Sequence, residues 1–81
     1  MEQEQKDILE KLIHNHCIGK KHLKETTILK GFNRKDHGKL KQAIKQLVRQ
    51  GYIVKHPTSH EDGYTIPSHE VAEVKALLKL R

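Results

Sequence analysis

The chain has 81 residues, of which 35% are hydrophobic, so it can bury one thin core but no deep catalytic cleft. No apolar run approaches the length of a membrane span, and the acidic residues 1–5 do not resemble a secretion signal. The one cysteine, Cys17, cannot form an internal disulfide, which fits a reducing cytoplasm. We therefore expect a single cytoplasmic domain over residues 1–81 that has no contact with a membrane.

Positive charge is concentrated in the middle of the chain. The net charge is +6, but residues 20–56 carry eleven Lys and Arg against two acids, a net charge of +9 that leaves −3 for the two ends together. This segregation is typical of a surface that binds phosphates, with a solvated lysine-rich face as the simpler alternative.

The first third of the chain is expected to contain two helices. Four apolar residues on one face predict a helix over about residues 4–16; they are Ile8, Leu9, Leu12 and Ile13. Cys17 and Ile18 are expected to form a very short strand, with Cys17 as a small core residue. A second, weaker helix is expected near residues 21–30, because Thr26 and Thr27 lower its helix propensity.

The most informative segment is residues 33–50. Its apolar residues fall on one helical stripe, which consists of Leu40, Ala43, Ile44, Leu47 and Val48. The opposite arc is basic and polar; it holds Arg34, Lys35, Gly38, Gln42, Lys45 and Arg49, with Lys39 and Lys41 on its flanks. In the preceding turn, Gly31 is expected to adopt positive φ and Phe32 to fill the core. Asn33 should cap the helix and Gly51 should end it.

A hairpin is expected after this helix. The β-rich runs at residues 52–54 and 64–66 flank an acidic turn at residues 61–63, which predicts Ile53 and Ile66 on paired antiparallel strands. Ser68 is then expected to cap a last helix. The apolar face of that helix consists of Val71, Val74, Leu77 and Leu78, and Leu80 falls outside it.

The run Ala43-Ile44, Leu47-Val48 and Gly51-Tyr52-Ile53-Val54 resembles the winged helix-turn-helix superfamily, and more narrowly its small archaeal-type members. The resemblance covers roughly residues 7–78. It implies an α+β winged helix-turn-helix fold with a three-helix core, a two-stranded wing and a C-terminal helix. It also implies that the third helix enters the DNA major groove while the wing contacts the neighbouring backbone. The acidic tip at residues 60–63 departs from this pattern and leaves only the flanks of the wing for DNA.

The expected function is therefore nucleic-acid binding without enzymatic activity, as in a transcriptional regulator. Double-stranded DNA is the expected partner, and RNA is the alternative. The residues expected to bind are Lys20, Lys21, Arg34, Lys35, Lys39, Gln42, Lys45, Arg49, Lys55, Thr58 and Ser59. Gln42 is the best candidate for reading a base directly, because a glutamine side chain can pair bidentately with adenine.

Other functions fit the sequence less well. Seven histidines invite a metal hypothesis, but one cysteine and no paired ligand spacing argue against zinc, so no metal and no cofactor are expected. Cys17 beside histidines is not expected to be a catalytic nucleophile. The alternative function is a protein-interaction module within a larger replication, transcription or RNA-processing assembly. A monomer is favoured slightly over a homodimer formed through the last helix.

Overall fold

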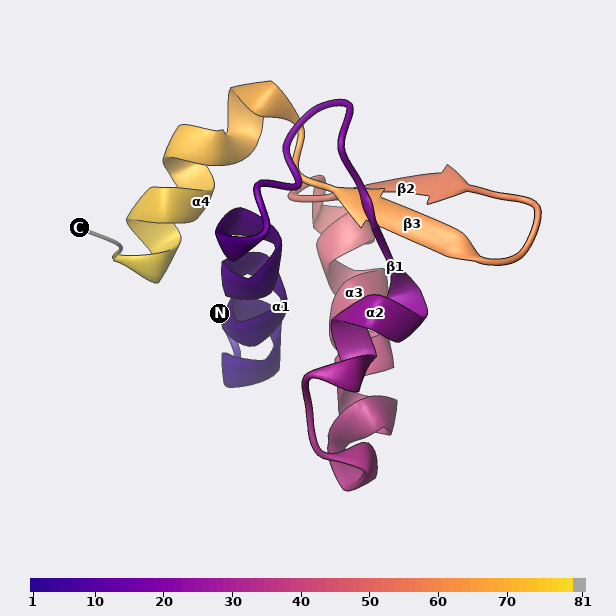
Figure 1. Ribbon diagram of the computed structural model, residues 1–81. Helices are drawn as coiled ribbons and strands as arrows, with labels where there is room; N and C mark the ends of the chain where they lie inside the picture. Colours follow the sequence, from indigo (N-terminus) through magenta and orange to yellow (C-terminus); the bar gives the residue numbers. More distant parts are fainter. Residues whose placement is uncertain (80–81) are drawn as a thin grey trace.

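The computed structural model describes residues 1–79 and shows an α+β arrangement (Figure 1). The elements in chain order are α1 (Gln3–His14), β1 (Leu23–Lys24), α2 (Glu25–Lys30), the 3-10 helix η1 (Arg34–Asp36), α3 (His37–Gln50), β2 (Val54–Pro57), β3 (Asp62–Thr65), the 3-10 helix η2 (Ser68–Glu70) and α4 (Val71–Leu78). The three strands form an antiparallel sheet in the order β1-β3-β2. The β2–β3 hairpin extends to one side of the helices, and α4 packs beside α1 on the other side. No helix within residues 1–79 is long and apolar enough to cross a membrane.

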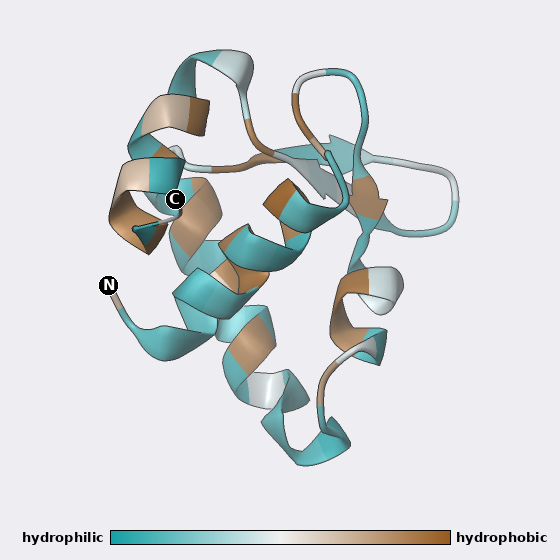
Figure 2. Ribbon diagram, turned by 60° about the vertical axis from the view of Figure 1, so that its left-hand side comes forward, coloured by the Kyte–Doolittle hydropathy of each residue, from teal (hydrophilic) through white to brown (hydrophobic). Residues whose placement is uncertain are grey.

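The core lies between α1, α2, α3 and the base of the hairpin. Seven residues from the predicted apolar helix faces and strand runs are at most 2% exposed and share one core: Leu9, Leu12, Leu40, Ile44, Leu47, Ile53 and Ile66. Cys17 is also fully buried, as expected, and Phe32 and Tyr52 pack at the rim of the core. In Figure 2, brown and teal segments alternate along the helices, as expected for helices with one buried face.

The segment between α1 and α2 differs from the prediction. The helix expected over residues 21–30 begins only at Glu25, because Leu23–Lys24 pairs with β3 and forms an unpredicted third strand. The expected strand at Cys17 and Ile18 is reduced to one isolated parallel bridge from Ile18 to Ile66. Pairing with β3 therefore determines the structure of Leu23 and Lys24, while the two threonines lie inside the shorter helix.

The turn before α3 also needs two corrections. Gly31 has a φ of −79°, so the expectation of positive φ is wrong. The α2 helix instead ends in a turn in which the Phe32 N–H donates a hydrogen bond to the Leu29 carbonyl at 3.0 Å. Asn33 does act as a cap, but it caps η1, since its side chain accepts a hydrogen bond from the Lys35 N–H. The α-helix proper therefore begins at His37.

The hairpin has a different turn and a different register from those predicted. Its turn spans residues 58–61, and Gly63 lies within β3 opposite His56. Ile53 and Ile66 are not partners on antiparallel strands, because the ladder ends at the pair Val54 and Thr65. The backbone of Ile66 bonds elsewhere: its N–H donates to the Cys17 carbonyl at 3.0 Å, and its carbonyl accepts from Gly19 at 2.9 Å.

The last helix has its apolar side toward the core, as predicted, but its N-cap residue differs from the predicted one. Ser68 begins η2 and does not cap α4, whose N-cap position is Glu70. Val74 is fully buried, while Val71 and Leu78 pack against the core from the side. Leu80 lies outside the described residues. The apolar side of α4 thus covers the core of its own chain.

Two glycine substitutions should change stability in opposite directions. Gly51 has a φ of +83° at the end of α3, whereas Gly38 lies inside the helix, and a Cβ at either position would meet no atom within 4 Å. Gly51→Ala should therefore lower the free energy of unfolding by about 1 kcal/mol, and Gly38→Ala should raise it by roughly 0.5 kcal/mol. Urea unfolding measures both changes, and a loss of stability at Gly38 would contradict this account of the helix.

Candidate nucleic-acid interface

The basic arc of α3 faces solvent because its apolar stripe is buried. All eleven residues predicted to bind nucleic acid are exposed: Lys20, Lys21, Arg34, Lys35, Lys39, Gln42, Lys45, Arg49, Lys55, Thr58 and Ser59. In the part of the chain that the structure describes, Lys55 is the only Lys or Arg in an ion pair; its Nζ lies 4.0 Å from a carboxylate oxygen of Asp62. Both side chains are about half exposed, so this pair adds little stability. The other cations of residues 20–56 can bind an external anion.

A basic groove lies between α3 and the hairpin. Lys41 and Lys45, one turn apart on α3, line it together with Lys55 of β2, and the hollow has a volume of about 440 Å³. Its other lining residues are Glu25, Val48, Asp62 and Tyr64. Lys41 was not among the predicted site residues, although its spacing of four from Lys45 places both on one side of the helix. Lysines from two separate elements are thus brought to one groove.

Both carboxylates of the groove already have partners. Asp62 is close to Lys55, and Glu25 accepts a hydrogen bond from the Tyr64 hydroxyl at 3.5 Å. Tyr64 is only 5% exposed, and its burial, with the nearby Glu25 carboxylate, raises the pKa of Tyr64 to about 12. The hydroxyl therefore stays protonated near neutral pH and remains a donor. The groove thus holds three lysines against two carboxylates, which leaves it a net charge of +1.

The other side of the α3 surface is less favourable for phosphates. Lys39 and Gln42 line a shallow hollow with Glu2 and Glu4 at the start of α1. Arg49 lies in a neighbouring hollow that also contains Glu2. These carboxylates oppose the approach of a phosphate from the α1 side. The predicted binding face is therefore divided into a basic side next to the hairpin and a mixed side next to α1.

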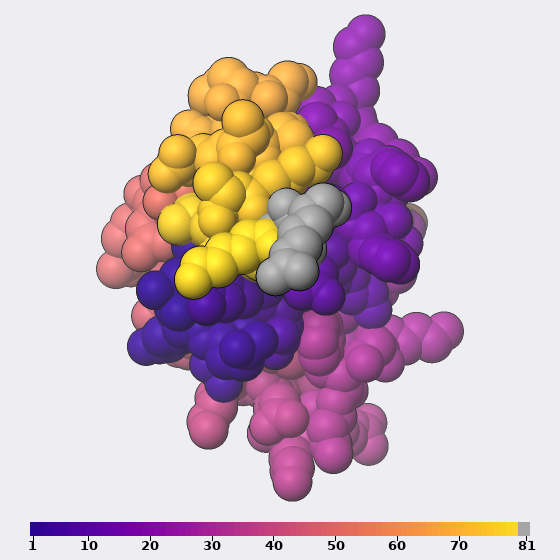
Figure 3. All heavy atoms as spheres, turned by 90° about the vertical axis from the view of Figure 1, so that its left-hand side faces the viewer, coloured from indigo at the N-terminus to yellow at the C-terminus, as the bar shows by residue number. Residues whose placement is uncertain are grey.

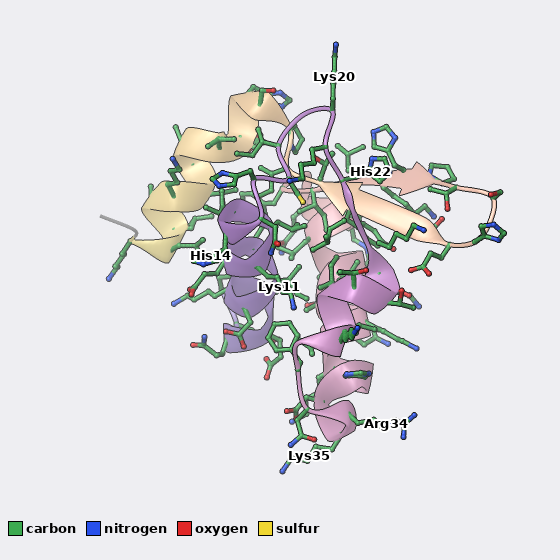
Figure 4. All side chains as sticks on the ribbon, viewed as in Figure 1. Lys11, His14, Lys20, His22, Arg34 and Lys35 are labelled. Carbon is green, nitrogen blue, oxygen red and sulfur yellow. The ribbon has the colours of Figure 1, made fainter. Side chains whose placement is uncertain are left out.

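The remaining predicted residues do not all share this surface. Arg34 and Lys35 project from η1 at one end of the molecule, while Lys20 projects from the opposite end (Figure 4). The longest dimension of the molecule is 30 Å. Lys20 thus points away from the groove, and with the neighbouring Lys21 it belongs to the loop that precedes β1. The structure does not bring these two lysines to the α3 surface.

The tip of the hairpin is docked onto α2. The carboxylate of Glu61 accepts hydrogen bonds from the N–H and the hydroxyl of Thr26, at 2.9 and 2.8 Å. Because Lys24 at the N-cap position offers no side-chain cap, Glu61 supplies the missing acceptor at the start of α2. The bond from the Thr26 N–H is the main reason why the pKa of Glu61 is lowered. The carboxylate of Glu61 is therefore engaged at the start of α2 and does not line the groove.

Thr58 holds the turn of the hairpin. Its hydroxyl donates to the Glu61 carbonyl and accepts from the Glu61 N–H, the second bond measuring 3.1 Å. Ser59 follows it at the exposed tip. Of the two hydroxyl residues predicted to contact DNA, Thr58 is engaged by the backbone of its own turn.

Two observations concern metal binding and the reactivity of the cysteine. Within residues 1–79, no group of three or more His, Cys, Asp and Glu side chains is placed to hold a metal ion. Burial raises the pKa of the Cys17 thiol, which favours the protonated and unreactive form.

Comparison of the chain with protein-family models, with curated proteins and with solved structures finds no match. The functional conclusion therefore depends on the surface of this molecule alone.

Glu61→Gln should destabilise the protein at neutral pH and not in acid. The folded-state pKa of Glu61 lies below its ordinary value of 4.5, so its ionised carboxylate stabilises the folded state above that pH, and this stabilisation is lost as pH falls through the folded-state pKa. Urea unfolding of both proteins at pH 7 and at pH 3 tests this, with amide exchange of Thr26 as a local readout. A pH-independent difference between the two proteins would mean that the charge of Glu61 does not hold the hairpin.

Proposed function

We propose that this chain is a winged helix-turn-helix protein that binds double-stranded DNA through α3 and the β2–β3 hairpin. The order of the elements supports this: a short turn joins α2 to α3, the hairpin follows α3 directly, and β1 completes the sheet. The observation that carries the proposal is the basic groove, where Lys41 and Lys45 have no ion-pair partner within residues 1–79 and Lys55 of the hairpin stands beside them.

The dimensions of the surface suit a duplex. The α3 helix has 14 residues, so it is about 21 Å long, and its exposed arc can enter a major groove that is about 12 Å wide. The hairpin then lies beside the helix at the level of the phosphate backbone. Lysines from both elements would release counterions from the same stretch of duplex, which favours binding without selecting a sequence.

The predicted residues have different roles in this proposal. Lys41, Lys45 and Lys55 bind phosphates in the groove, and Arg34 and Lys35 extend the contact at the start of α3. Gln42 reads a base edge from the centre of the exposed arc. Lys39 and Arg49 contribute less, because Glu2 and Glu4 lie beside Lys39 and Glu2 lies beside Arg49. A transcriptional regulator without enzymatic activity is the cellular role that fits these contacts.

The rival function is a protein-interaction module. The large hydrophobic residues that are exposed within residues 1–79 are Met1 and Val54, which offer little apolar area for a protein partner. Figure 3 shows the face formed by α4 and α1. On this face, Val74 of α4 is turned inward and fully buried in the core of the chain. We therefore favour duplex binding by a monomer over docking through α4.

Removing the two groove lysines of α3 should weaken binding to every duplex. If about five cations neutralise phosphates, the logarithm of the association constant falls with the logarithm of salt at a slope of roughly −4 to −5. Lys41→Ala with Lys45→Ala should flatten this slope by up to about two, whatever the sequence of the duplex. Fluorescence anisotropy of a labelled duplex over a salt series gives the slope.

The matched control removes the same charge elsewhere. Lys6→Ala with Lys75→Ala takes two cations from α1 and α4 and should leave the slope almost unchanged. If both double variants reduce affinity and slope equally, binding depends on net charge and not on the groove. If neither variant affects binding, the groove is only solvated surface, and the protein-interaction module becomes the better explanation.

Gln42→Ala should change sequence preference without changing the slope. The side chain carries no charge, so it releases no counterion, whereas a bidentate contact with adenine is worth about 1–3 kcal/mol of discrimination. Selection from a randomised duplex library compares the two preferences, and Gln50→Ala at the end of α3 is the control. An unchanged preference after Gln42→Ala would assign base readout to another residue.

A further inference from the structure

The outer face of the sheet carries two stacked imidazoles. The rings of His22 and His56 lie with their centroids 5.1 Å apart and their planes at 15°. Both residues are exposed, and they come from opposite edges of the sheet: His56 from β2, and His22 from the position just before β1. In Figure 4, His22 lies on the side of the sheet that faces away from α2 and α3.

Gly63 makes this arrangement possible. It lies in β3, the middle strand, directly opposite His56, and a Cβ at this position would lie 2.4 Å from Cδ2 of His22. Any side chain on Gly63 would therefore displace the His22 ring. A glycine inside a strand often marks such a close approach by another group.

The charged residues of the sheet are divided between its two faces. Residues directly opposite each other in a ladder share a face, so Lys24, Gly63 and His56 lie together on the outer face. Asp62 lies near Lys55 on the inner face. The carboxylate of Glu61 is bonded to Thr26 and also interacts with the charge of Lys24, which helps to lower the pKa of Glu61. Glu25 accepts from Tyr64, also on the inner face.

The loop before β1 adds more positive charge. Lys21 is exposed directly before His22, and Lys20 projects from the same side of the molecule as His22 (Figure 4). Within residues 1–79, neither His22 nor His56 forms an ion pair with a carboxylate. Two imidazoles that can each gain a proton thus stand together among lysines, with no acid of this chain paired to them.

We propose that His22 and His56, with Lys24, form a second phosphate-binding site whose affinity increases as the two imidazoles are protonated. Two adjacent imidazolium ions repel each other. A bound phosphate offsets this repulsion, and protons are taken up as it binds. The range in which to look for this response is about pH 5 to 8, where histidine side chains in general change charge. Its ligand is a phosphate group of a polyanion, and its identification as a nucleic-acid phosphate rests on the proposed function.

Binding of a labelled duplex at several pH values tests the site. Between pH 8 and pH 5, wild-type affinity should rise by roughly tenfold, with uptake of about one to two protons per protein, counted by calorimetry in buffers of different ionisation enthalpy. His22→Gln with His56→Gln should keep the affinity at pH 8 within about twofold and lose most of the rise. The matched control, His14→Gln with His69→Gln, removes two exposed histidines from other elements and should behave like the wild type. Equal pH dependence in both double variants would overturn the proposal.

Inorganic tripolyphosphate separates this inference from the proposed function. In NMR titrations near pH 6, tripolyphosphate should shift the ring resonances of His22 and His56 more than those of His14 and His69. If the wild type binds no duplex at any pH but these shifts occur, the duplex-binding proposal fails while the phosphate site stands. If tripolyphosphate shifts all four histidines alike, the phosphate site is overturned, whatever the result with the duplex.

Discussion

Burial of one apolar stripe of α3 determines where the charges of the central segment lie. Leu40, Ile44 and Leu47 are at most 2% exposed, and full burial of each such side chain is worth about 1.5–3 kcal/mol. Repulsion between Lys41 and Lys45, four residues apart on the helix, costs only about 0.2–0.5 kcal/mol. The apolar stripe therefore sets the rotation of the helix, and the lysines are held together despite their repulsion. An anion in the groove would relieve that repulsion.

The second wall of the groove is positioned by two contacts at opposite ends of the hairpin. Gly51 ends α3 with a φ of +83°, and the hairpin that follows extends to one side of the helices. At the far end, Glu61 ties the tip of the hairpin to the first turn of α2 through Thr26. A hairpin held at both ends keeps Lys55 near the lysines of α3 before any ligand arrives. Such preorganisation reduces the entropy that binding must overcome.

The features that could be predicted from the sequence are the local ones. The buried stripe of α3 and the stop at Gly51 follow from helical spacing and from one glycine. The errors concern contacts between distant segments: β1 pairs with β3, Ile66 bonds to Cys17, and Glu61 caps α2. No local pattern contains these partners. For the same reason, the sequence indicated which side chains of α3 are exposed, but not that Glu2 and Glu4 lie beside Lys39 and Gln42.

Gly63 illustrates how a strand residue can be misassigned to a turn. Its neighbours Glu61 and Asp62 have turn chemistry, yet the structure places it in the middle strand, where glycine costs roughly 0.5–1 kcal/mol relative to alanine. The His22 ring occupies the space that a side chain would need. The cost in stability thus accompanies a close contact between an imidazole and the backbone of the sheet. A residue chosen only for stability would not leave this space, so Gly63 is better explained by the histidine pair that it admits.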